Sequence, residues 1–387
     1  MAGWLLAAVG LWCAWRPAEI AVGSWLVVAV GGLCLLPWAW RRTPARAWRT
    51  AVPALTALAV WLTIAALTGR DPASGLGELA LLAAVVVVAW CGSRRAPDEG
   101  HLLAVGLGLA ALALWALWQV TAGFDQAAAG LDQLPPALRA PAAERLALGR
   151  AFASQLLPGH LAALLAMALA LLIPRLVDRR FRAPTVAGVG LALLGLVLTR
   201  SPLGAGLALA AILALVLPAR GGRGRPWLVA AGLVLAAVVL SRPDLARLEP
   251  VQLRLENWHA AMWVLETAPV TGAGLGAYGQ AAAAWPAEAH LRPSHAHAMP
   301  LEVLAELGVP GLVALALAGA WVVRRAVAAW RVRPGLVAAV LVIPLHNLVD
   351  FSLYMSGVAV VWAVLLGRML AAARGGSEES ANHPARG

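Results

Sequence analysis

Long apolar runs recur along the whole chain, and they constrain its fold more than any other feature. Of the 387 residues, 61% are hydrophobic and only 13% are charged, which is too apolar for an ordinary soluble domain. Most of the runs approach the roughly 20 apolar residues that a helix needs to cross a bilayer. A segment in lipid must satisfy its own backbone hydrogen bonds, as a helix does. The pattern therefore predicts an all-α polytopic membrane protein.

Loops rich in arginine, proline and glycine divide the chain into about twelve predicted transmembrane helices, with a range of 10–12. We expect an N-terminal transmembrane bundle of about nine spans over 1–240, a large extracytoplasmic loop over 241–299, C-terminal transmembrane helices over 300–372, and a disordered cytoplasmic tail over 373–387. The predicted spans are 3–15, 18–40, 51–68, 75–91, 101–122, 151–174, 184–199, 203–217, 226–240, 300–323, 334–345 and 351–370.

The basic residues indicate how the chain is oriented. All 30 are arginine, and most lie in short loops between the predicted spans. With the amino terminus in the cytoplasm, the inside loops, the end of the last span and the tail hold 20 arginines and 5 of the 19 acidic residues. This bias follows the positive-inside rule, so we predict that both termini are cytoplasmic and the long loop is outside. The net charge of +11 therefore indicates topology, and we expect no nucleic-acid partner.

The predicted extracytoplasmic loop ends in a histidine pair, His295 and His297, directly before the tenth span. Imidazole is the side chain best suited to accept a proton near neutral pH. Such a pair can also bind a metal, but no third ligand with convincing spacing stands beside it, so we expect no metal site. A solvated pair at the membrane surface is the alternative without a function.

Arg254 is the first candidate for binding an anion. It lies in a predicted amphipathic helix over 250–267, whose apolar stripe we assign to Trp258, Met262 and Leu265. An arginine at the outer surface can hold a phosphate through two parallel hydrogen bonds. An ion pair with a neighbouring carboxylate or a lipid headgroup is the alternative.

Polar residues at the boundaries of spans are the remaining candidates. Arg200 separates the seventh and eighth spans, where an arginine is costly unless it is paired or hydrated, and snorkelling is its alternative. Asp350 and His346 flank the turn before the last span, where the carboxylate can orient a histidine or cap a helix. Glu302 and Glu306 lie one turn apart, so they share a face of the tenth span, which we expect to point into the protein.

The segment 271–279, TGAGLGAYG, contains four glycines and superficially resembles a nucleotide-binding loop. No strand precedes it and no Gly-Lys-Ser/Thr follows, so we exclude that interpretation. The glycines predict a tight turn after the amphipathic helix.

Several of these segments occur in an order that is typical of one family. The chain resembles the O-antigen ligase family, which includes lipopolysaccharide O-antigen ligases, O-linked oligosaccharyltransferases and Wzy-type polymerases. Ala298 stands where the family has asparagine, and Pro202 stands where it has arginine, with Arg200 before it. The segments that carry the resemblance are RAFASQLLPGHLA, LTRSPLGAGLAL, RLENWHAAMWVLETAPVTGAGLGAY, HAHAMPLEVLAELGVPG and HNLVDFSLYMSG.

The resemblance implies a GT-C-like, metal-independent glycosyltransferase without a cofactor, in the inner membrane of a bacterium and with its active site facing the periplasm. Its donor is a glycan on undecaprenyl pyrophosphate, and its acceptor is a hydroxyl of lipid A-core, of a protein or of a growing polysaccharide. His297 is then the catalytic base, and Arg254 and Arg200 bind the donor pyrophosphate. Supporting roles fall to His295, Glu306, Asp350 and His346.

A non-enzymatic transporter or lipid carrier with a polar external vestibule is the alternative. That class predicts charges near the midplane of the membrane and broken helices in paired halves. The sequence places no charge deep within a predicted span, which favours chemistry at the membrane surface.

Overall fold

The computed structural model describes residues 52–94, 98–216, 249–286 and 294–382, together with residues 8, 11, 12, 14 and 15. Every regular element within these ranges is a helix. The predicted spans 18–40 and 226–240, and most of the span 3–15, lie outside the described residues.

The chain divides into two compact units, each assembled from segments that are far apart in the sequence. Unit 1 contains Met1–Glu19, Pro97–Leu245 and Arg333–Ile343, and unit 2 contains Ile20–Ala96, Ala246–Val332 and Pro344–Gly387. The predicted boundaries at 240, 299 and 372 divide the chain into consecutive segments. The two units instead group segments that pack together, whatever their order in the sequence.

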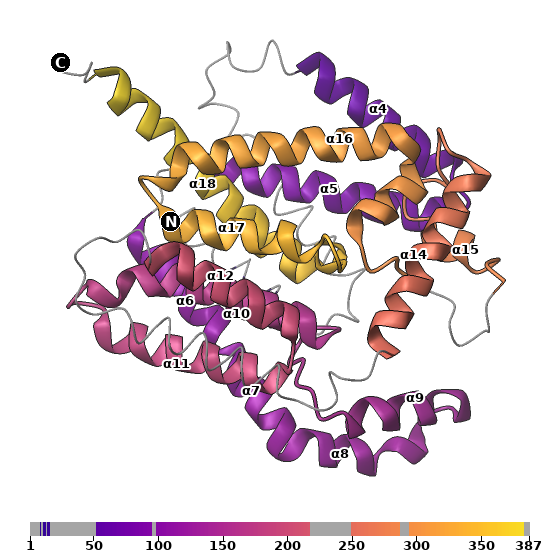
Figure 1. Cartoon of the computed structure of the whole chain (residues 1–387), viewed down its shortest axis with the longest axis horizontal. Helices are drawn as coiled ribbons and strands as arrows, with labels where there is room; N and C mark the ends of the chain where they lie inside the picture. Colours follow the sequence, from indigo (N-terminus) through magenta and orange to yellow (C-terminus); the bar gives the residue numbers. More distant parts are fainter. Residues whose placement is uncertain are drawn as a thin grey trace. The chain divides into compact units, whose positions relative to one another are not determined.

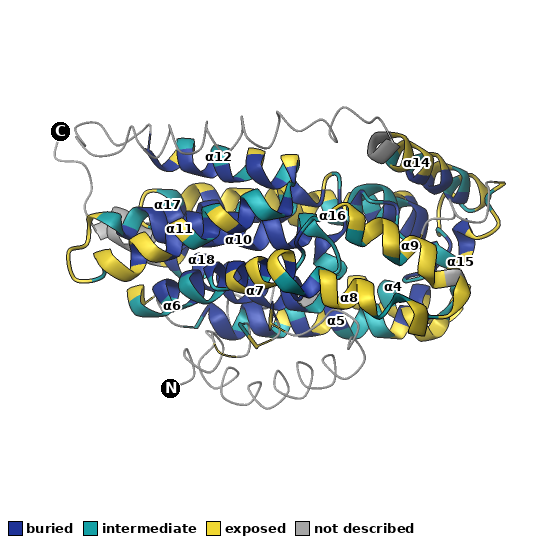
Figure 2. Ribbon diagram, turned by 90° about the horizontal axis from the view of Figure 1, so that it is seen from below, coloured by how far each residue is buried: buried dark blue, intermediate teal, exposed yellow. Residues whose placement is uncertain are grey.

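Unit 1 is built around α10 (Pro158–Leu172), in which every residue from His160 onward is buried. Figure 2 shows this helix in dark blue along most of its length. Small residues on its neighbours allow close approach: a Cβ on Gly204 would lie 2.2 Å from the Cβ of Ala162. The helices packed against α10 are α6 (Glu99–Ala110), α11 (Arg182–Thr199) and α12 (Pro202–Val216).

Residues 123–150, which follow the fifth predicted span, are largely helical. The chain leaves α7 (Leu112–Trp118) through a π-helical turn, Gln119–Gly123, and continues as α8 (Phe124–Ala129) and α9 (Pro136–Ala147). Gln119 fixes the following turn, because its Oε1 accepts from the N–H of Ala153 at 2.7 Å and its Nε2 donates to the carbonyl of Ala153 at 3.2 Å.

Unit 2 contains a close helix crossing between α5 (Pro72–Gly92) and α18 (Ser356–Asn382). A Cβ on Gly367 of α18 would lie 2.2 Å from the carbonyl oxygen of Ala89, so glycine permits the contact. α18 also packs against α16 (Met299–Trp330), and all three helices are seen in Figure 1. The remaining elements of this unit include α4 (Val52–Thr68), α14 (Glu249–Thr267), α15 (Tyr278–Ala282) and the 3-10 turn Ser352–Tyr354.

The glycine-rich segment between α14 and α15 joins three parts of unit 2. Gly272, Gly274 and Gly276 all have positive φ, as a tight turn requires. The N–H of Gly274 donates to the carbonyl of Glu306 in α16 at 2.9 Å, and the N–H of Leu275 donates to that of Ala65 in α4 at 3.3 Å. The segment is therefore held by backbone contacts on both sides.

α16 is interrupted at Gly308, whose φ of 64° and ψ of −166° are not helical. Val309 after the break donates its N–H to the carbonyl of Pro269 at 3.2 Å, and a Cβ on Gly308 would lie 2.2 Å from the carbonyl oxygen of Val270. The break thus lets the end of the α14 loop approach the helix backbone directly.

The described helices are those of a helical membrane protein. Six helical stretches are long and apolar enough to cross a membrane, and three shorter helices are also apolar. Several expose large apolar side chains such as Val86, Val186, Leu317 and Val327, which lipid would cover. The long stretches are Pro72–Gly92, Glu99–Ala129, Pro158–Val177, Arg182–Thr199, Met299–Trp330 and Ser356–Arg374, and the short helices are Ala57–Thr68, Pro202–Val216 and Pro334–His346.

The nine apolar helices coincide with nine predicted spans, with some shifted ends. α10 begins at Pro158 and not at residue 151, because residues 151–157 form a turn and Pro158 occupies the first helical turn. α16 continues to Trp330, past the predicted end at residue 323, since arginines do not terminate a helix. α18 begins five residues later than predicted and extends to Asn382.

Candidate functional site

The histidine pair lies in a short irregular segment of unit 2 that leads into α16. His297 has a φ of 51°, an uncommon value for a residue other than glycine, while Ala298 is extended and begins the helix. The two imidazoles are partly exposed, with 26% and 29% of the side-chain surface of His295 and His297 accessible. The pair therefore combines a fixed backbone with side chains that a ligand can reach.

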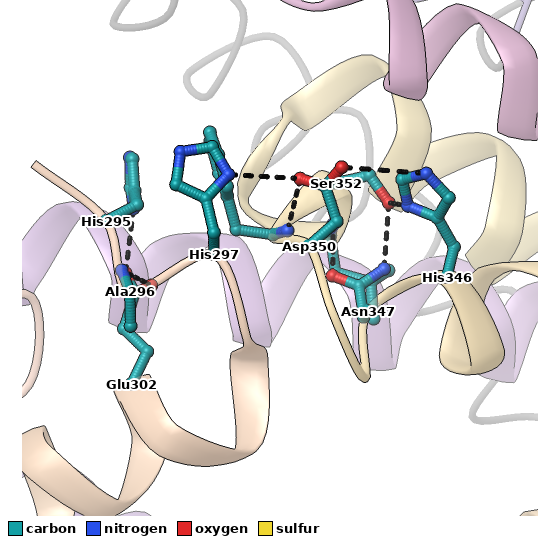
Figure 3. A network of polar contacts seen from close by, with 10 residues as sticks. His295, Ala296, His297, Glu302, His346, Asn347, Asp350 and Ser352 are labelled. Atoms are coloured by element: carbon teal, nitrogen blue, oxygen red, sulfur yellow. Dashed lines mark hydrogen bonds and ion pairs between the residues drawn. The ribbon is translucent and has the colours of Figure 1, made fainter. Parts of the chain in front are cut away.

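Asp350 lies between two histidines. Its Oδ1 is 3.8 Å from Nδ1 of His297, and its Oδ2 is 3.6 Å from Nε2 of His346 (Figure 3). Asp350 and His346 are buried, whereas His297 is partly exposed. The sequence suggested that Asp350 could lie near one histidine, and the structure places it near two. Such a carboxylate orients the imidazole ring and stabilises its protonated form.

The turn that carries Asp350 is tied together by side chains. Asn347 donates from Nδ2 to Oγ of Ser352 at 2.8 Å and accepts at Oδ1 from the N–H of Leu353 at 3.1 Å. The backbone N–H of Met299, at the start of α16, is 3.0 Å from the carbonyl of Asn347 and 3.2 Å from that of Asp350. These bonds fix the histidine pair relative to Asp350.

Glu302 makes the shortest histidine contact of the site. Its Oε1 is 2.7 Å from Nδ1 of His295, and its Oε2 accepts from the N–H of Ala296 at 2.9 Å. Sequence reasoning placed Glu302 in the interior but gave it no role. A signal was present, because a carboxylate in the first turn of a helix can reach back to the N–H groups before it.

Aromatic rings pack around the two histidines. The ring of Phe351 is stacked on His295 at 4.1 Å and meets His297 edge-on at 4.7 Å. Tyr354 lies 5.5 Å from His295. Burial raises the pKa of Tyr354 well above its usual value, and the charges of Glu302, Glu306 and Glu78 raise it further. The phenol therefore stays neutral at physiological pH.

Glu306 lies apart from the histidine contacts. Its Oε1 accepts from the N–H of Tyr278 at 3.1 Å, while its buried Oε2 has no hydrogen-bond partner among the described residues. The hydroxyl of Tyr278 donates to the carbonyl of Asn257 in α14 at 3.0 Å. Burial raises the pKa of Tyr278 above its usual range, with contributions from Glu302 and Glu306. Glu306 thus supports the glycine-rich segment.

Arg254 lies on α14, which forms where the amphipathic helix was predicted, and the predicted apolar stripe is not the face that α14 packs against its neighbours. Met262 is exposed, and Trp258 and Leu265 are only partly buried. α14 packs against α15 and α16 through smaller side chains, which allow a closer approach than the large residues of the stripe. The buried residues of α14 are Asn257, Ala260, Ala261 and Val264.

Two buried side-chain nitrogens of α14 lack hydrogen-bond partners among the described residues. Nε of Arg254 and Nε1 of Trp258 are buried, and neither has a hydrogen-bond partner among the described residues. The two residues are one helical turn apart, so their side chains share a face. Buried donors without a partner are rare, and each requires an explanation.

Arg200 belongs to unit 1 and caps the carboxyl end of α11 in the left-handed conformation, with a φ of 48°. Its Nη1 donates to the carbonyl of Leu148 at 2.8 Å, so it is bonded to protein and is not simply extended toward solvent. The structure therefore brings His295, His297, His346 and Asp350 together, while Arg254 lies elsewhere in unit 2 and Arg200 in the other unit.

Fold and site together define a polytopic helical membrane protein with a histidine–carboxylate centre at the start of α16. Among the described residues, no three histidine, cysteine, aspartate or glutamate side chains are placed to hold a metal ion. No protein-family model matches the chain, and no curated protein sequence is significantly similar to it.

Proposed function

We propose that the chain is a membrane glycosyltransferase of the O-antigen ligase family, which transfers a glycan from an undecaprenyl-pyrophosphate carrier to an acceptor hydroxyl. The observation that carries this proposal is the partly exposed ring of His297 beside the buried carboxylate of Asp350, 3.8 Å away. A histidine backed by a carboxylate is an effective general base. The resemblance of the surrounding segments to the family supports the choice of reaction.

In this reaction the acceptor hydroxyl oxygen attacks the anomeric carbon of the donor glycan. The bond from that carbon to the diphosphate oxygen breaks, and the diphosphate leaves with the electron pair. The hydroxyl proton passes to His297, and Asp350 stabilises the resulting imidazolium. The diphosphate is already a good leaving group, so the protein supplies a base and cations.

Arg254 supplies a cation for the diphosphate. Its unpartnered Nε, together with the unpartnered Nε1 of Trp258, offers two donors on one face of α14. Phosphate oxygens would satisfy both, and a guanidinium binds them in a forked geometry. Arg200 is the second proposed donor-binding residue, since its bond to Leu148 occupies only part of a guanidinium with five donors.

The proposal includes about twelve spans in a GT-C-like arrangement, in the inner membrane of a bacterium, with the histidine centre toward the periplasm. The apolar helices and the distribution of arginine support this placement. The acceptor hydroxyl belongs to lipid A-core, to a protein or to a growing polysaccharide.

The test is transfer from a lipid-linked glycan by the purified protein in detergent. We expect His297→Ala to lower kcat by about 10²–10⁴-fold, the usual cost of losing a general base. Arg254→Ala should abolish transfer, and Arg254→Lys should lower it strongly, because an ammonium lacks the planar fork. His259→Ala and Arg324→Ala, which change exposed residues, are the matched controls and should keep the normal rate.

Size-exclusion profiles show whether each variant remains folded. A folded His297→Ala protein with a near-normal rate would remove the proposed base and the mechanism with it.

The transporter or lipid-carrier alternative is favoured by one observation. α16 is broken at Gly308, and the two carboxylates before the break, Glu302 and Glu306, are buried. Broken helices with buried charges are typical of transporters. Proteoliposomes that contain the lipid-linked glycan distinguish the two functions: the glycosyltransferase forms a new glycosidic bond on an added acceptor, whereas a carrier moves the unchanged lipid between leaflets.

A further inference from the structure

Glu302 is buried and contacts two different groups of the histidine pair. Its side chain is 2% exposed, and one carboxylate oxygen lies 2.7 Å from Nδ1 of His295 while the other accepts from the N–H of Ala296. An ionised carboxylate only accepts hydrogen bonds, so Nδ1 of His295 carries the proton in this contact.

The backbone on both sides of His297 is fixed. Ala296 before it is held by Glu302, and Met299 after it is held by the carbonyls of Asn347 and Asp350. Between these two anchors His297 has a φ of 51°. A residue remains in this sparsely populated region only when its surroundings enforce it.

We propose that Glu302 is a positioning residue for the proton acceptor: by holding the ring of His295 and the N–H of Ala296, it forces His297 into the left-handed conformation that places its ring beside Asp350. The expected effect of Glu302 on kcat rests on the proposed function, whereas its effect on the conformation of His297 does not. It assigns to the buried carboxylate a role in catalysis that acts through another residue.

The amide variant Glu302→Gln tests the contact between Glu302 and His295 without an activity measurement. Only the oxygen of the amide can accept from the N–H of Ala296, so the amide NH₂ faces Nδ1 of His295, which must then accept. We therefore expect Nδ1 of His295 to carry no proton in this variant, while the backbone stays in place.

This change is visible by nitrogen NMR of full-length protein labelled with ¹⁵N-histidine in detergent, with the His295 signals assigned by their loss in His295→Gln. Glu306→Gln is the matched control, because Glu306 is also buried, lies one turn further along α16 and supports Tyr278. It should leave the tautomer of His295 unchanged. The same tautomer of His295 in the wild type and in Glu302→Gln would overturn the contact.

The activity of two variants then separates positioning from other roles. Glu302→Leu removes both bonds and should lower kcat by about 10²-fold, as a misplaced catalytic group does, with KM for the donor nearly unchanged. Glu302→Gln keeps both bonds and should retain most of the rate. Equal losses in the two variants would show that the charge of Glu302 matters and its positioning does not, which would overturn the proposal.

A double-mutant cycle shows whether Glu302 acts through His297. In the His297→Ala protein, Glu302→Leu should cost little more, because the group that it positions is already absent. If the rate losses of Glu302→Leu and His297→Ala multiply in the double variant, the inference is refuted and the proposed function is unaffected. A fully active His297→Ala protein would instead refute the proposed base, and the tautomer of His295 would still decide the contact. Should Glu302→Leu not fold, Glu302→Asp, which is one methylene too short to hold both donors, takes its place.

Discussion

At the scale of single residues, one carboxylate serves two histidines. Asp350 presents one oxygen to the partly exposed His297 and the other to the fully buried His346. A buried carboxylate needs such partners, because an unpaired charge in the interior is costly. The contact with His346 therefore helps to orient the carboxylate of Asp350 toward His297.

Asp350→Asn keeps the size of the side chain but removes its charge. We expect kcat for glycan transfer to fall by about 10- to 100-fold, which corresponds to losing a charged partner worth about 1.5–3 kcal/mol. Transfer by the purified variant is compared with that of the exposed-site control Asp125→Asn. Equal rates for the two variants would show that Asp350 does not assist the base.

The residues of the site were predictable where their types are distinctive. His295, His297, His346 and Asp350 stand at the ends of apolar runs, where imidazole and carboxylate have few structural reasons to occur. Glu302 was not assigned a role, because its partner is set by the irregular backbone of the histidine segment. A left-handed residue other than glycine leaves no periodic pattern in the sequence.

At the scale of elements, backbone contacts between segments matter as much as side-chain packing. The glycine-rich segment approaches α4, the start of α5 and the break in α16 so closely that a methyl group has no room: a Cβ on Gly274 would lie 2.2 Å from the Cα of Gly69. The sequence indicated a turn here, but only the structure shows that the glycines are needed for these contacts.

Gly274→Ala should destabilise the protein by about 1–3 kcal/mol, because Gly274 has a φ of 107° and its new methyl group would meet backbone atoms. Gly77→Ala on α5, where nothing lies within 4 Å, is the matched control and should stabilise by about 0.5–1 kcal/mol. Thermal unfolding in detergent compares the two. A Gly274→Ala protein that melts with the control would contradict the role of this contact.

The existence of the helices could be predicted better than their ends and faces. Apolar runs mark nine described helices, because a bilayer requires that pattern whatever the tertiary contacts are. The face that α14 buries against protein was not predicted, since small residues such as Ala260 and Ala261 give no strong periodic signal. The break at Gly308 likewise depends on a loop that is distant in sequence.

At the scale of the whole molecule, contacts between loops agree with the predicted alternation of sides. Glu99 is 2.6 Å from Arg175 and also pairs with Arg333, and these residues belong to three different loops that are all predicted to face the cytoplasm. In unit 2, Arg70 donates its N–H to the carbonyl of Ala273, and both residues are predicted to be external. The alternation and the orientation are both predictions from the distribution of arginine.

Single cysteines at exposed positions test this orientation in a chain whose three native cysteines are replaced by alanine. Ala283→Cys lies after α15 and should react with an impermeant thiol reagent on intact cells, whereas Ala183→Cys, in the first turn of α11, should react only after lysis. The positive-inside rule gives the direction. The reverse pattern of labelling would overturn the orientation.

The close crossing of α5 and α18 has a consequence for the synthesis of the protein. Ser93, which follows α5, accepts a hydrogen bond from Arg374 of α18, 281 residues later. At translation rates of roughly 5–20 residues per second, α5 leaves the ribosome about 15–55 s before its principal partner. During that interval the glycine-bearing surface of α5 lies in the membrane without its partner or is held by insertion factors. A chain that lacks α18 therefore leaves α5 without its principal packing partner.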